Sequence, residues 1–151
     1  MKIERDLLNN FTRLYEKQER LSSLTDQKLF GSFSNSEVHT IDIIGSFEEV
    51  NGVLIASKLD MTRGAISKII AKLSKKDAIY KYQTKENKKE IYYGLTDYGK
   101  ELYEKHKLAH KDWENRELEF FHGMEEDDKE KLNKFLIKYN DYLNNLIKES
   151  S

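Results

Sequence analysis

Basic residues gather in one stretch of this chain, residues 58–89. The stretch has ten Lys and Arg against three acids, a net charge of +7, although the whole chain carries only −1. The remaining residues must therefore sum to −8. A concentrated positive face on an otherwise acidic protein is typical of a surface that binds a polyanion such as nucleic acid.

The same stretch has the pattern of a helix followed by a hairpin. Apolar residues recur at helical spacing over 63–75 and predict one buried face, made by Ile66, Ile69, Ile70 and Leu73. Thr62 is placed to cap this helix. Residues 79–84 and 90–95 are rich in Tyr and other β-formers, and the polar residues between them predict a solvated turn. This order indicates a helix-turn-helix with a β-wing, a module that reads DNA.

The residue types of this module suggest how the contacts to DNA are divided. The N-terminal half of a recognition helix reaches base edges, and Arg63 suits a bidentate contact with guanine. Gly64 is small enough to permit close approach to the groove floor. The full set of predicted DNA contacts is Thr62, Arg63, Gly64, Ser67 and Lys68 at the bases, Lys72, Lys75, Lys76 and Lys85 at phosphates, and Asn87, Lys88 and Lys89 at the wing tip. A single lysine here could simply lie on a solvated helix face without contacting DNA. The excess of positive charge on both the helix and the wing favours DNA binding for the group as a whole.

Helical patterns on both sides of the module complete the expected fold. The sequence predicts helices at about 3–24, 35–48, 53–59, 97–121 and from about 125 onward, with a loop at 25–33. Ser34 and Glu37 form a capping box at the second helix. We expect a mainly α protein with a small β-hairpin. In it, one domain over 1–151 holds a winged helix-turn-helix at about 34–95, flanked by dimerisation helices at about 3–24 and 97–149.

The flanking helices carry long apolar stripes that something must cover. On the last helix the stripe is Leu132, Phe135, Leu136, Tyr139, Tyr142, Leu143, Leu146 and Ile147. One interpretation is packing within the chain, and the other is a helical homodimer. A dimer explains the stripes better, because two recognition helices need a rigid connector to reach half-sites ~34–36 Å apart.

Three segments in this order resemble the MarR family of bacterial transcription regulators. They are SNSEVHTIDIIG, LDMTRGAISKIIAKLSKKDAI and ENKKEIYYGLTDYGKEL, and the last contains the family's Leu-Thr-x-x-Gly pattern at Leu95, Thr96 and Gly99. The resemblance implies a cytoplasmic, homodimeric repressor that binds double-stranded operator DNA and responds to a small effector. The family's wing tip commonly reads Asp-Arg-Arg, where this chain has Asn87, Lys88 and Lys89. Since Lys lacks the fixed donor fork of Arg, we expect weaker discrimination of minor-groove shape.

The histidines of the chain suggest an effector site, and three alternatives remain for what this site does. His106 and His110 are four residues apart and share one helix face, a spacing that suits a metal ion. Likeness to zinc-responsive members implies a Zn²⁺ site of His39, His106, His110 and a carboxylate, Glu19 or else Glu16. Those members carry Glu where this chain has Val38. Residues 39–45 also resemble fatty-acid-synthesis repressors of the family, which answer to acylated carrier protein. A polar cluster without ligand, a zinc site and part of an acyl-type pocket are therefore the three alternatives.

Other classes of protein find little support in the residues. The chain has no Cys, which excludes a disulfide or a thiolate metal site, and it shows no nucleophile elbow or phosphate loop of an enzyme. No apolar run is long enough for a membrane span, and residues 1–10 lack the apolar centre of a signal peptide. The remaining alternative is a helical adaptor whose basic patch binds an acidic protein. A sequence preference and a steep salt dependence with DNA would exclude it.

Overall fold

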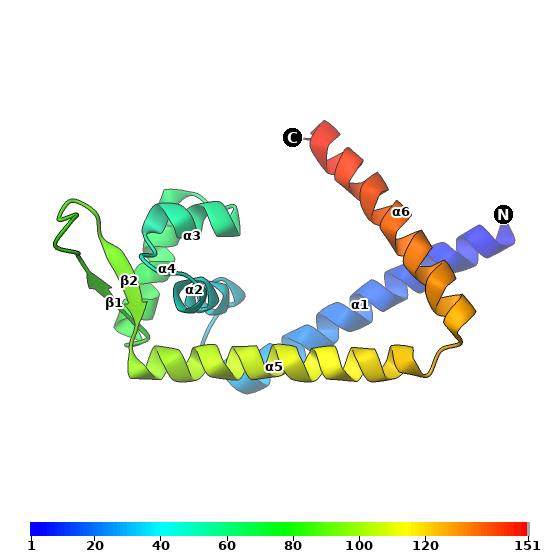
Figure 1. Cartoon of the computed structure of the whole chain (residues 1–151), viewed down its shortest axis with the longest axis horizontal. Helices are drawn as coiled ribbons and strands as arrows, with labels where there is room; N and C mark the ends of the chain where they lie inside the picture. The colour runs from blue at the N-terminus through cyan, green and yellow to red at the C-terminus, as the bar shows by residue number, and fades with distance from the viewer. Residues whose placement is uncertain (151) are drawn as a thin grey trace. The chain divides into compact units, whose positions relative to one another are not determined.

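The elements follow one another in the predicted order, four helices, two strands and two helices. The computed structural model describes residues 1–150, and its chain divides into two compact units, residues 1–108 and 109–151. Figure 1 labels the elements, which are α1 (Lys2–Phe30), α2 (Asn35–Ser46), α3 (Gly52–Leu59), α4 (Arg63–Lys75), β1 (Ile79–Tyr82), β2 (Tyr92–Leu95), α5 (Asp97–His122) and α6 (Glu126–Ser150). The fold class predicted from the sequence is therefore confirmed.

The first helix is longer than its sequence pattern predicts. The predicted end at residue 24 and the loop at 25–33 are wrong, because α1 continues to Phe30. Thr25 does not interrupt the helix, since its hydroxyl donates to the carbonyl of Leu21 at 3.0 Å within the same helix. Phe30 is only 3% exposed and packs into the core of the first unit. Burial of this ring at the helix end outweighs the weak helical preference of the polar residues before it.

The core of the first unit lies where α2, α3 and α4 meet the hairpin. Ile41, Ile55 and Leu73 are fully buried there, one from each helix. On α4 the spacing of Ile66, Ile69 and Leu73 places all three on the buried face, as predicted, whereas Ile70 is only half-buried beside them. The opposite face of α4 is left for solvent or for a partner.

A local cap begins each of the three short helices, and the sequence predicts those at Ser34 and Thr62. Ser34 and Glu37 form the reciprocal capping box of α2. Asn51 accepts a hydrogen bond from the Leu54 N–H at 2.8 Å and so caps α3. Thr62 accepts from the Ala65 N–H at 3.2 Å and caps α4. Between α3 and α4 the chain passes through Asp60 in the left-handed conformation, with φ 51° and ψ 49°, which makes the turn of the helix-turn-helix.

The hairpin is antiparallel and shorter than predicted. β1 and β2 pair from Ile79 opposite Leu95 to Tyr82 opposite Tyr92. Residues 83–84 and 90–91, which were predicted as strand, therefore belong to the wing tip. Val50 adds one more bridge to Tyr93 and joins the hairpin to the loop before α3. Figure 1 shows the hairpin beside α4, at one end of the helical module.

The junction between the hairpin and α5 gives the Leu-Thr-x-x-Gly pattern a physical meaning. The Thr96 hydroxyl donates to the Asp77 carbonyl at 2.6 Å and accepts from the Gly99 N–H at 3.0 Å. A Cβ on Gly99 would lie only 2.0 Å from the carbonyl oxygen of Ala78. Residue 99 must therefore be glycine for α5 to begin against the turn that follows α4.

The second unit contains the end of α5 and all of α6. Every residue of α6 has exposed or half-buried side chains. Its aromatic residues stack along the helix, with ring centroids of Phe135 and Tyr139 at 5.8 Å and those of Tyr139 and Tyr142 at 6.0 Å. The apolar stripe of α6 thus faces outward in the single chain. Within residues 1–150, each helix has too few consecutive apolar residues to cross a lipid bilayer.

Candidate nucleic-acid interface

The outer face of α4 collects most of the side chains that the sequence assigns to DNA. These residues are all exposed, and they lie opposite the buried isoleucines: Thr62, Arg63, Gly64, Ser67, Lys68, Lys72 and Lys75. An apolar face buried in the module and a basic face in solvent are what a recognition helix needs to enter the major groove.

Gly64 differs from the glycines that the fold requires. A Cβ added to Gly64 would meet no atom of this chain within 4 Å, whereas one added to Gly45 would lie 2.5 Å from the Tyr103 ring. Glycine inside a helix costs roughly 0.5–1 kcal/mol relative to alanine. The packing of this chain therefore does not require glycine at position 64, and the close approach of Gly64 to the groove floor stays a prediction.

The wing tip is held by its own polar side chains. Asn87 Oδ1 accepts from the backbone N–H groups of Lys89 and Glu90, at 3.2 Å each, and the Asn87 N–H donates to Thr84 Oγ1 at 3.1 Å. The Gln83 amide donates to the Lys88 carbonyl at 2.7 Å. Asn87 stays a predicted DNA contact, and its side-chain oxygen also shapes the turn. The turn leaves Lys85, Lys88 and Lys89 exposed.

The sequence did not indicate two further contacts of the wing, one that attaches it to the start of α3 and one that lies within the hairpin. Asn51 donates from Nδ2 to Glu90 Oε1 at 2.9 Å, while its oxygen caps α3. Tyr82 packs between Tyr80 and Tyr92, with ring centroids at 5.9 and 5.7 Å. Burial raises the pKa of Tyr82, and the nearby Glu49 carboxylate adds to this effect, so the phenol stays neutral. The wing is therefore fixed at its base as well as at its tip.

Lys76, the C-terminal cap residue of α4, is a predicted DNA contact whose ammonium bonds to other residues of the protein. Its Nζ lies 2.6 Å from Glu37 Oε2 and 2.5 Å from the carbonyl oxygen of Ser32, and 4.5 Å from the centre of the Phe33 ring. The assignment of Lys76 to a DNA phosphate stays a prediction. Its ammonium group already donates hydrogen bonds to the Ser32 carbonyl and to the Glu37 carboxylate.

Glu37 is 3% exposed and keeps its charge because of these bonds. Burial is the strongest influence on Glu37 and opposes ionisation. The hydrogen bonds from Lys76 and from the Ser34 backbone, with the positive charge of Lys76, together hold the pKa of Glu37 below its usual value. An ion pair between the buried Glu37 and the half-buried Lys76 thus joins the end of α4 to the start of α2. Sequence reasoning found the capping role of Glu37 but had no signal for a partner 39 residues away.

The structure brings together two of the four residues predicted as an effector site. The rings of His39 and His106 meet edge to face with centroids at 6.2 Å. His106 is 8% exposed, and its Nδ1 lies 3.4 Å from Asp42 Oδ1, a neighbour that the sequence did not indicate. His110 follows one turn later on α5 and is exposed.

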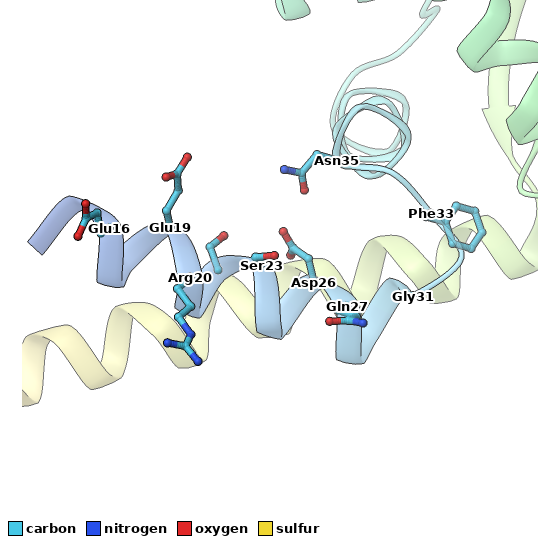
Figure 2. Close-up of a pocket in the computed structure, with 10 residues that line it drawn as sticks. Glu16, Glu19, Arg20, Ser23, Asp26, Gln27, Gly31, Phe33 and Asn35 are labelled. Atoms are coloured by element: carbon cyan, nitrogen blue, oxygen red, sulfur yellow. The ribbon is translucent and has the colours of Figure 1, made fainter. Parts of the chain in front are cut away.

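Glu19, the fourth predicted residue, lies on an open groove of about 830 Å³ along α1. Figure 2 shows Glu19 and Arg20 pointing to different sides of α1, with Phe33 beyond the C-terminal end of this helix. Among residues 1–150, no three His, Asp or Glu side chains are grouped so that they could hold a metal ion. The zinc site of His39, His106, His110 and Glu19 stays a prediction.

Comparison with curated proteins identifies relatives along most of the chain. A model of the MarR family matches residues 33–91, which include the whole recognition helix. The HTH-type transcriptional regulator PchR of Bacillus subtilis (strain 168) is 29% identical over 136 residues, covering 83% of this chain and 80% of PchR. The HTH-type transcriptional regulator YhjH of the same strain, itself uncharacterised, is 32% identical over 131 residues, covering 78% of this chain and 75% of YhjH.

Solved structures agree on the fold. The chain resembles Streptococcus pneumoniae FabT in complex with DNA, with a TM-score of 0.76 and 22% identity over 94% of this chain and 98% of FabT. It also resembles ZitR of Lactococcus lactis, a zinc-responsive MarR family member, with a TM-score of 0.71 and 15% identity over 91% of this chain and 99% of ZitR. The chain belongs to the MarR family of helix-turn-helix transcriptional regulators, which bind DNA and are not enzymes.

Proposed function

We propose that the protein is a homodimeric repressor that binds an operator with α4 in the major groove and the wing over the flanking backbone. The observation that supports this most strongly is the division of α4 into a buried isoleucine face and an exposed basic face. Arg63 would contact a guanine. Lys68, one turn further along the helix, would also contact a base, and Lys72 would contact a phosphate where the helix leaves the groove. Lys88 and Lys89 would contact the phosphates or the minor groove beside it.

The terminal helices support the homodimer. Large apolar side chains of α1 and α6 are exposed in the single chain, among them Leu7, Leu14, Leu143 and Leu146. Isolated exposed leucines are ordinary, but stripes of this length on two long helices are typical of an interface. A second copy of the chain is the partner that would cover them and place two basic helices at one palindromic site.

DNA selection followed by binding measurements tests this function. The purified protein is used to select duplexes from a random pool, and its affinity for the selected duplex and for random duplex is then measured over a salt series. We expect a specific site with two related half-sites, and a steep loss of affinity as salt rises, about −0.9 in slope for each phosphate contacted. Binding without sequence preference, or with a flat salt response, would favour the adaptor alternative.

Repression and effector response need their own measurements. Transcription from a promoter that carries the selected site should fall when the protein is added. The small effector is proposed to bind near the junction of α2 and α5, where His39 and His106 meet. Elemental and mass analysis of the native protein would distinguish the alternatives, since stoichiometric zinc supports a metal effector and a bound acyl chain supports a lipid-like one. With zinc, His106→Ala should abolish the metal-dependent change in DNA affinity.

A further inference from the structure

The contacts of Lys76 and Glu37 join three segments at one point. Lys76 is the C-terminal cap residue of α4, and its ammonium contacts Glu37 at the start of α2 and both Ser32 and Phe33 in the loop after α1. Glu37 uses its other oxygen, Oε1, to accept from the Ser34 N–H at 3.4 Å. The end of the recognition helix is thereby tied to the loop through which the long helix α1 enters the module.

The other contacts of α4 with the module are less directional. The buried side of α4 is formed by Ile66, Ile69 and Leu73, and apolar packing tolerates small rotations and shifts of a helix. The Lys76–Glu37 ion pair is more restrictive, because the Glu37 side chain is 5% exposed and moving the part-exposed Lys76 away would leave that carboxylate without its partner in a poorly solvated place. In some proteins such pairs set the register of packed elements and add little net stability.

We propose that Lys76 and Glu37 act as a positioning pair, which sets the orientation of the recognition helix and thereby its discrimination between DNA sequences. This inference rests on the proposed operator binding and goes beyond it, because it gives Lys76 a role within the protein in place of a phosphate contact. Lys75, its exposed neighbour, keeps the phosphate role.

Two substitutions with opposite effects on charge test the pair. Lys76→Met removes a positive charge and Glu37→Gln removes a negative one, yet each breaks the same ion pair. We expect both to lower the ratio of affinities for selected and random duplex by roughly tenfold, within the range of couplings between contacting residues. We expect the salt slope to stay that of the native protein. The double variant should lose no more than either single one, because the pair is broken only once.

The conservative variant and a neighbour serve as controls. Lys76→Arg keeps a cation opposite Glu37 and should retain the native ratio. Lys75→Ala should weaken binding to all duplexes alike and make the salt slope shallower by about 0.9. Thermal unfolding and sedimentation of each variant show that it is folded and in the native oligomeric state. If Lys76→Met does not fold, Glu37→Gln and Lys76→Arg still decide the question.

The outcomes separate the alternatives. If Lys76→Met behaves like Lys75→Ala while Glu37→Gln binds as well as the native protein or better, Lys76 is a phosphate contact and the positioning pair is wrong. If the native protein itself shows no preference for any duplex, the proposed function fails, and the positioning role fails with it. The two failures are distinguishable, because only the second one affects the native protein.

Discussion

At the scale of single residues, α4 separates side chains that shape the helix from side chains left for DNA. The Thr62 hydroxyl oxygen accepts the hydrogen bond that caps the helix, whereas the Arg63 side chain is exposed beside it. A Cβ added to Gly64 would meet no atom of this chain within 4 Å, so the packing of the chain does not require glycine at this position. Two predictions follow from these neighbours.

Arg63→Ala should lower operator preference and leave the fold unchanged. A lost bidentate contact with guanine costs about 1–3 kcal/mol of discrimination. Fluorescence anisotropy with the selected and random duplexes measures the loss, and Lys105→Ala on the exposed side of α5 is the matched control. If Arg63→Ala keeps the native preference, α4 has been assigned the wrong role.

Gly64→Ala should raise stability and weaken DNA binding at the same time. Alanine favours the helix by roughly 0.5–1 kcal/mol over glycine, and the new methyl group meets no atom of the chain. The same methyl group would lie where the groove floor approaches. Urea unfolding and anisotropy measure the two effects, and a stabilised variant with native DNA affinity would contradict close approach at this position.

At the scale of elements, the structure shows which features a single sequence can reveal. The caps at Ser34 and Asn51 depend on residues three apart, so their spacing could be predicted before the fold was known. The pairs Lys76–Glu37 and Asn51–Glu90 each span 39 residues and depend on tertiary packing, so nothing local indicated them. The end of α1 was mispredicted for the same reason, because burial of Phe30 decides it.

The effector site shows the same limit. The rings of His39 and His106, which the likeness to zinc-responsive members assigns to one site, lie edge to face, and Asp42 is the carboxylate beside His106. A likeness in sequence places residues on helices, and the side-chain neighbours of each histidine depend on how those helices pack.

The wing supplies a prediction about the second element that contacts DNA. Lys88→Ala combined with Lys89→Ala should weaken binding to every duplex and make the salt slope shallower by up to about 1.8, since each phosphate contact contributes about 0.9. The tip should stay intact, because Asn87 holds it through its side-chain oxygen and the backbone. An unchanged slope in a salt series would remove the wing from the contact set.

The link between α2 and α4 gives a pH dependence with a definite sign. The pKa of Glu37 is held below its usual value in the folded protein, so its ionised form stabilises the fold above about pH 4.3, the usual range for Glu. That stabilisation is lost as the pH falls toward the lower folded pKa. The stability difference between the native protein and Glu37→Gln should therefore be larger at about pH 7 than at about pH 3. Urea unfolding at both values measures it, and a constant difference would contradict an ionised Glu37.

At the scale of the whole molecule, the proposed homodimer covers the exposed apolar stripes of α1 and α6 with a second copy of the chain. Leu146→Asp should separate the dimer and weaken operator binding, because a charge would be buried at the interface. Analytical ultracentrifugation measures the mass, and circular dichroism confirms that the helices remain. Asn144→Asp, two residues before it on α6, adds the same charge as a control. A monomeric native protein would contradict the proposal before any variant is made.

Asn51 carries a consequence for the protein as it ages. One amide caps α3 with its oxygen and holds Glu90 with its nitrogen, and it is followed by glycine. Slow deamidation through a succinimide with the Gly52 nitrogen would convert part of Asn51 to aspartate, which keeps the cap because a carboxylate also accepts from the Leu54 N–H, and part to isoaspartate, whose rerouted backbone would not. The bond to Glu90 would become a repulsion between two carboxylates at the base of the wing. Old preparations would then keep their helical content and lose affinity for DNA.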